Sequence, residues 1–174
     1  MAAFKIAGAI LVAVSGALLG MVFQRELYQR ILLLQDFQRG LLFLHQEITY
    51  LKVPLGEAAL NAGQPLLEPL ASFFRETGKK LEKLPGSSFL EVWTEMEERY
   101  LEDIALKQED LELIRQLGVQ LERMEPGGGS SFLEMFEQRV EAALAEAREE
   151  YRGKAQLYRR LGMMGGIFLV ILLL

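Results

Sequence analysis

The sequence predicts an all-α protein: a compact helical bundle of about six helices with N- and C-terminal membrane-inserted helices. Apolar side chains recur every three or four residues over long stretches, which is the period of an amphipathic helix. Strands are not expected, since no stretch of any length alternates apolar and polar residues. Uninterrupted apolar runs occupy both ends. We therefore expect a transmembrane anchor over residues 1–23, a cytoplasmic bundle over 24–160 and a hydrophobic membrane segment over 161–174.

The two ends have the composition of membrane segments. Residues 6–23 form an 18-residue run whose only polar side chain is Ser15, and as a helix they reach about 27 Å, close to the thickness of a bilayer core. A signal peptide is the alternative, but no clear small-x-small cleavage site follows. Residues 161–174 are uncharged and reach only about 21 Å. Whether this second run fully spans the bilayer stays open, because a tilted helix or a buried core helix also fits.

Basic residues indicate the orientation. Arg25 and Arg30 follow the first run, and Arg159 and Arg160 precede the second. Positive charges gather on the cytoplasmic side of membrane proteins. The bundle is therefore expected in the cytoplasm, with both termini toward the far side.

The middle of the chain reads as helices separated by proline and glycine. A long helix continues from the anchor to Leu51, and Pro54 ends it. Further helices are expected over residues 54–62, with Gly63 as a cap, from Pro65 to about Thr77, over 89–106, over 108–124, and from about 132 into the tail. Residues 79–83 are expected to be a charged exit and 126–131 a flexible linker, where Gly127–Gly129 have no assigned role.

Residue types exclude several kinds of site. Cysteine is absent, so a disulfide framework, a thiolate metal site and a cysteine nucleophile are ruled out. His45 is the single histidine, and we expect it at a surface or helix edge. Acidic groups such as Glu95, Glu97 and Glu98 are expected on solvated helix faces. No enzyme activity, cofactor or metal is predicted, and a carboxylate-dependent membrane hydrolase is the weak alternative.

The charge balance bears on partners. Residues 24–160 carry 18 basic and 24 acidic side chains, so their net charge is −6. A nucleic-acid binder usually presents a basic stripe, and none is visible. Nucleic acid is therefore not an expected partner.

Small residues four apart mark both apolar ends. Gly16 and Gly20 form such a pair in the first run, and Gly162 and Gly166 form one in the second. Glycines at this spacing let membrane helices approach closely. They are candidate helix-packing sites, within one chain or between chains of a homo-oligomer.

The order of three segments resembles the stage III sporulation protein AB family of endospore-forming bacteria. These are the glycine-containing N-terminal run, "LLFLHQEITYLKVPLGEAA" at residues 41–59, and the terminal "LGMMGGIFLVILLL". The middle segment matches the family's pattern through Glu47, Ile48, Tyr50, Pro54, Leu55, Glu57 and Ala58. The likeness covers the whole length.

The resemblance implies a function. Members of this family are components of the channel complex between mother cell and forespore, and their soluble domain is similar to the cytoplasmic domain of the type II secretion system F platform protein. It implies a protein of the mother-cell membrane that serves as a platform for a cytoplasmic secretion-type ATPase and other membrane subunits of the same complex. The alternative is a general secretion or pilus inner-membrane platform not tied to sporulation.

Candidate protein-interaction residues are Glu47, Tyr50, Pro54 and Glu57. A helix end, an aromatic side chain and a proline meet here with acidic groups on both sides. The equally plausible alternative is that Tyr50, Pro54 and Leu55 merely form a packed helical corner.

Overall fold

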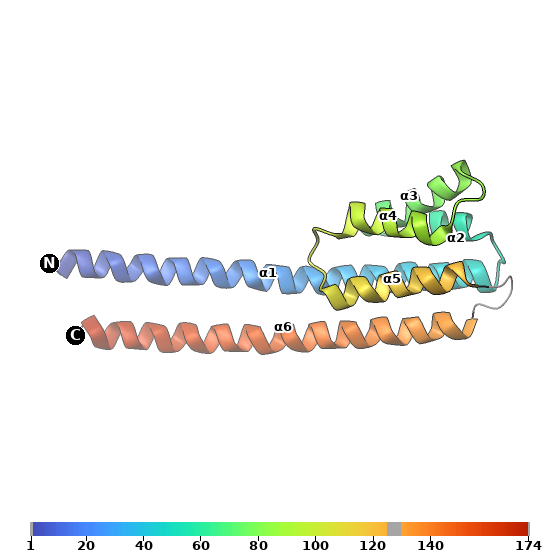
Figure 1. The fold of residues 1–174 in the computed structure, drawn as a ribbon. Coiled ribbons are helices and arrows are strands. Elements are labelled where there is room, and N and C mark those ends of the chain that lie inside the picture. Colours follow the sequence, from blue (N-terminus) through green and yellow to red (C-terminus); the bar gives the residue numbers. More distant parts are fainter. Residues whose placement is uncertain (1, 125–129, 174) are drawn as a thin grey trace. The chain divides into compact units, whose positions relative to one another are not determined.

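The part of the chain that the structure describes folds as six α-helices. The computed structural model describes the backbone of residues 2–124 and 130–173 and the side chains of residues 24–124 and 131–154, and these residues contain no β-strand. The helices are α1 (Ala2–Thr49), α2 (Leu55–Ala62), α3 (Leu70–Lys83), α4 (Phe89–Leu101), α5 (Gln108–Glu122) and α6 (Ser130–Leu173) (Figure 1). The all-α class is confirmed.

The membrane segments are a separate matter. Within the residues whose side chains are described, no helix is long and apolar enough to cross a bilayer. The predicted membrane segments, residues 6–23 and 161–174, lie outside that part of the chain, and so do Gly16, Gly20, Gly162 and Gly166.

The chain divides into two compact units. Residues 30–145 form one, and residues 1–29 with 146–174 form the other. In the second unit the rings of Tyr28 on α1 and Tyr151 on α6 lie 6.0 Å apart between centroids, and Gln24 Nε2 donates a hydrogen bond to the Tyr151 hydroxyl at 3.2 Å. Within this unit, α1 and α6 therefore contact each other through these polar and aromatic groups.

The core of the 30–145 unit comes from the apolar stripes read in the sequence. On α1 the stripe Leu34, Phe37, Leu41 and Leu44 is almost entirely removed from solvent, and α6 contributes Leu133, Phe136 and Val140. Each such side chain stabilises the fold by about 1.5–3 kcal/mol through burial. Helices α2 to α5 lie along this stretch of α1 (Figure 1).

Trp93 on α4 lies at the centre of an aromatic cluster. Its ring meets Phe73 edge-to-face at 4.6 Å, Phe74 at 5.7 Å and Phe89 at 5.3 Å between centroids. Its Nε1 donates to the Ile114 carbonyl at 3.0 Å, so the one polar atom of this buried ring is satisfied. Trp93 thereby ties α3, α4 and α5 together.

Glycines allow two close helix contacts. A Cβ on Gly118 would lie 2.4 Å from Trp93 Cδ1, and one on Gly78 would lie 2.5 Å from the Gly56 carbonyl oxygen. The indole packs onto the bare backbone of α5, and α3 approaches the backbone of α2. Larger residues at either position require the helices to move.

The helix boundaries of α1, α3, α4 and α5 differ from the sequence prediction. Helix α1 ends at Thr49, two residues early, so Leu51 leaves the apolar stripe and is exposed. The third helix starts at Leu70, not Pro65, and it continues through the expected charged exit to Lys83 because Leu81 packs against the core. Helices α4 and α5 end at Leu101 and Glu122, five and two residues early.

The predicted cap at Gly63 is confirmed, and the structure adds a cap before α4. Helix α2 runs to Ala62 and Gly63 caps it. Ser88 caps α4 by accepting a hydrogen bond from the Glu91 amide at 3.3 Å. The last helix begins at Ser130, close to the predicted Phe132.

A buried ion pair joins α1 to α5. Arg30 Nε and Nη2 lie 2.7 and 2.9 Å from the two carboxylate oxygens of Asp110, and both side chains are at most 4% exposed. Asp110 Oδ2 also accepts a hydrogen bond from the Lys107 amide at 2.9 Å at the start of α5. Such a two-pronged pair fixes the register between two helices.

Asp36 links α1 to the segment before α3. Its Oδ2 accepts a hydrogen bond from the Leu67 amide at 2.7 Å, and its Oδ1 pairs with Arg39 at 2.8 Å. The expectation that acidic groups lie on solvated faces is therefore wrong for both Asp36 and Asp110. Each is buried because it bonds to a partner distant in sequence.

Candidate functional site

The turn between α1 and α2 is tightly bonded. The amides of Tyr50 and Leu51 both donate to the Gln46 carbonyl, at 3.0 and 3.3 Å, and the Val53 amide donates to the Glu47 carbonyl at 3.1 Å. Lys52 adopts a left-handed φ of 53°, which lets the chain reverse. We call residues 50–57 the α1–α2 corner.

Two apolar side chains of the corner point into solvent. Tyr50 is 76% exposed and Leu51 is 66% exposed. They are adjacent in sequence and follow the last residue of α1. An exposed aromatic beside an exposed leucine, on a backbone held by three hydrogen bonds, is typical of a contact surface for another protein.

Glu47 and Glu57 have different roles. Glu47 is half-buried and its Oε2 accepts a hydrogen bond from Asn61 Nδ2 at 3.0 Å, so it ties α1 to α2. Glu57 is exposed in the first turn of α2, where the helix dipole favours a negative charge. Pro54 precedes α2 and is also exposed. The structure thus brings all four predicted residues to one corner, with Glu47 holding it and the other three facing solvent.

His45 is largely buried, not at the surface. Its Nδ1 lies 2.6 Å from Glu137 Oε1 on α6, and its side chain is only 12% exposed. Its ring lies nearly parallel to that of Tyr50, 6.4 Å away between centroids. Of the two predicted places, a surface or a helix edge, the surface is wrong because a carboxylate 92 positions away covers part of the ring. This contact between α1 and α6 supports the corner from the side of α6.

Leu51, Asn61 and Glu137 also belong to this site, and the sequence reading did not select them. Leu51 was assigned to the core stripe, and only the end of α1 at Thr49 exposes it. Asn61 and Glu137 are ordinary polar residues of helices in sequence terms. Their partners become visible only in three dimensions.

Glu97 is a further acidic group that the sequence placed wrongly on a solvated face. It is 3% exposed, its Oε1 accepts from Arg115 Nη2 at 2.7 Å, and its Oε2 is buried without a hydrogen-bond partner. Burial raises the pKa of this carboxyl above its usual value, although the nearby Arg115 opposes the shift. Among the described residues, no three His, Cys, Asp or Glu side chains gather as ligands for one metal ion.

Known proteins place the chain in context. The family model described as Stage III sporulation protein AB matches residues 5–174. A solved structure titled "Stage III sporulation protein AB (SpoIIIAB)" has the same fold, with a TM-score of 0.64, 21% sequence identity, and coverage of 71% of this chain and 97% of that chain. No curated protein matches.

Proposed function

This chain belongs to the stage III sporulation protein AB family, and we propose that it is a membrane platform on which other subunits of a sporulation complex assemble. The resemblance read from the sequence is thereby confirmed, and so is the shared fold. In the proposal the bundle lies in the cytoplasm at the mother-cell membrane. It binds a secretion-type ATPase or other membrane subunits through the α1–α2 corner, and it acts without catalysis.

One observation carries the proposal: Tyr50 and Leu51 are exposed on a bonded turn. Neighbouring apolar side chains that are exposed together can mark a protein interaction site. Tyrosine is among the residues that most often dominate binding energy at protein interfaces. Each side chain would gain about 1–2 kcal/mol by leaving water upon docking.

The surrounding contacts make the corner suitable for docking. The hydrogen bonds to Gln46 and Glu47 and the bond between Glu47 and Asn61 already order the backbone. Binding of a partner at this segment therefore costs less conformational entropy than binding at a flexible loop would. Glu57, exposed seven positions after Tyr50, adds a negative charge that would favour a basic partner surface.

Substitution of both apolar side chains tests the site. Tyr50→Ala with Leu51→Ala should lower heat-resistant spore counts and reduce the partners crosslinked to the chain in sporulating cells. Leu67→Ala is the matched control, because Leu67 is similarly exposed at 73% and its segment is bonded to the middle of α1. Normal crosslinking by the double variant, at normal protein level and helix content, rejects the corner as the docking site.

The acidic group is tested separately. Glu57→Ala should weaken partner recovery modestly, and Glu57→Lys should weaken it more, since charge reversal adds repulsion. If both variants recover as much partner as the parent protein does, Glu57 does not contribute to docking, and Tyr50 and Leu51 alone form the contact.

A gene deletion tests the sporulation role itself. Loss of heat-resistant spores, rescued by the intact gene, supports the proposal. Normal spore numbers would favour the general secretion or pilus platform instead. The family match is the reason to place sporulation first.

A further inference from the structure

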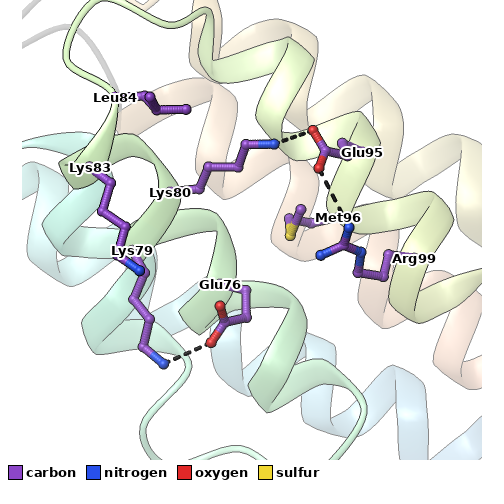
Figure 2. A pocket seen from close by; sticks show the side chains of 8 residues that line it. All are labelled: Glu76, Lys79, Lys80, Lys83, Leu84, Glu95, Met96 and Arg99. Atoms are coloured by element: carbon purple, nitrogen blue, oxygen red, sulfur yellow. Dashed lines mark hydrogen bonds and ion pairs between the residues drawn. The ribbon is translucent and has the colours of Figure 1, made fainter.

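A groove between α3 and α4 concentrates positive charge. It has a volume of about 450 Å³ and lies open on the surface of the 30–145 unit. Figure 2 shows the side chains that line it: Glu76, Lys79, Lys80, Lys83 and Leu84 from α3 and its end, and Glu95, Met96 and Arg99 from α4. Four cations and two carboxylates leave a net charge of +2 in a chain whose net charge is −5.

The two carboxylates of the groove are already engaged. Glu76 accepts from Lys79 Nζ at 2.7 Å, while Glu95 bonds to Lys80 and lies 3.9 Å from Arg99. These cations hold the pKa of both carboxyls below the usual value. The excess positive charge is therefore available to an incoming anion at the pH of the cell.

The lining of the groove favours a helix as its occupant. Met96 is buried in its floor, and Leu84 is 51% exposed at its edge. An amphipathic helix with an apolar side chain between two carboxylates matches both features. A lipid bilayer fits less well, because its flat surface cannot follow a concave groove.

The chain itself presents such a helix. The part of α6 inside the 30–145 unit has an exposed face made of Glu134, Met135, Gln138, Glu141 and Ala142, which we call the α6 face. Its two carboxylates lie seven positions apart, two helical turns or about 10.5 Å along the axis. These carboxylates complement the excess of cations in the groove, and Met135 supplies an exposed apolar side chain. The exposed Arg139 borders the face and donates a hydrogen bond to Gln116 on α5 at 2.9 Å.

The two surfaces cannot meet within one molecule. Within the 30–145 unit, α3 and α4 lie at one edge and α6 lies at the opposite edge, with α1 and α5 between them (Figure 1). A groove on one edge and its complement on the other join copies head to tail.

We propose that the α3–α4 groove binds the α6 face of a second copy of this chain. The contact is heterologous: every copy offers one groove and one face. It uses surfaces other than the α1–α2 corner, so it stands independently of the proposed function. Repetition of the contact gives a ring if the rotation closes and an open row of copies if it does not.

Charge reversal with cross-complementation tests the proposal. The full-length chain is purified in detergent and its self-association is measured by sedimentation. Lys79→Glu with Lys83→Glu reverses the groove and leaves the Lys80–Glu95 bond intact, while Glu134→Lys with Glu141→Lys reverses the face. Each double variant should associate about ten- to a hundredfold more weakly than the parent protein, because like charges then meet.

An equal mixture of the two double variants gives the decisive result. The acidic groove of one variant then faces the basic α6 face of the other, so association should return. Arg123→Glu with Arg148→Glu is the control, since both arginines are exposed outside the two surfaces and the net charge changes equally. This control should associate like the parent, and raising the salt concentration should weaken the parent.

Four results overturn the proposal. The first is a monomeric parent protein, and the second is a control variant that loses association equally. The third is a mixture that fails to recover while each variant keeps its helix content. The fourth is self-association that neither charge reversal weakens, which would place the contact in other segments such as the membrane helices.

Discussion

Gly118→Ala should destabilise the bundle, although alanine is the better helix former. In an exposed helix this change stabilises by up to about 1 kcal/mol. At position 118 the new Cβ would lie 2.4 Å from Trp93 Cδ1, 2.8 Å from Nε1 and 2.9 Å from Cγ. All three atoms belong to a rigid, fully buried ring. The indole must therefore move.

The cost has two parts. Overpacking a tightly filled core costs about 1–3 kcal/mol. Displacement of the ring also breaks the bond from Trp93 Nε1 to the Ile114 carbonyl, which leaves a buried donor without a partner at about 1–3 kcal/mol. After subtraction of the helix-propensity gain, we expect a loss of about 1–5 kcal/mol in the free energy of unfolding.

Urea unfolding of the full-length chain in detergent, followed by circular dichroism, measures this loss. Gly153→Ala is the matched control, since Gly153 is exposed on α6 and a Cβ there meets nothing within 4 Å. It should be neutral or slightly stabilising. A Gly118→Ala variant that unfolds at the same urea concentration as the parent protein, or higher, refutes the packing argument.

Three further changes are expected to alter the same unfolding curve. Asp110→Asn leaves the Arg30 charge buried without its carboxylate and should cost about 3–5 kcal/mol; a loss below 1 kcal/mol would show that the pair is dispensable. Gly78→Ala should lower the free energy of unfolding by more than about 1 kcal/mol, since its Cβ would meet the α2 backbone at 2.5 Å. An unfolding curve identical to that of the parent protein would contradict this close contact. Burial raises the pKa of Glu97, so the folded state holds this proton more tightly and stability should fall as pH rises from 4.5 through the raised value. Glu97→Gln is uncharged at every pH and should remove that fall. If the free energy of unfolding depends on pH in the same way in the variant and the parent protein, the role of Glu97 is disproved.

The sequence predicted the scaffold well because helix signals are local. The apolar spacing on α1 and the cap at Gly63 depend on residues within a few positions of one another. The end of α1 was misplaced by two residues, and this small error decides whether Leu51 is core or surface. Because α1 ends at Thr49, Leu51 is exposed and joins Tyr50 in the apolar pair at the corner.

Buried charges could not be assigned from the sequence because their partners lie far along the chain. Arg30 and Asp110 are 80 positions apart. One local signal was present: Arg30 occupies the position four before Leu34 on the apolar stripe of α1, where a charge must find a counter-charge. The groove between α3 and α4 was missed because its lysines read as the end of a helix, whereas they continue α3.

The placement of Trp93 makes the chain its own spectroscopic reporter. It is the only tryptophan in the sequence, so its fluorescence comes from one known position. The ring is fully buried among Phe73, Phe74 and Phe89, and water would shift its emission to longer wavelength if the three helices around it separated. Loosening of α3, α4 and α5 can thus be followed without a label, in detergent or in lipid.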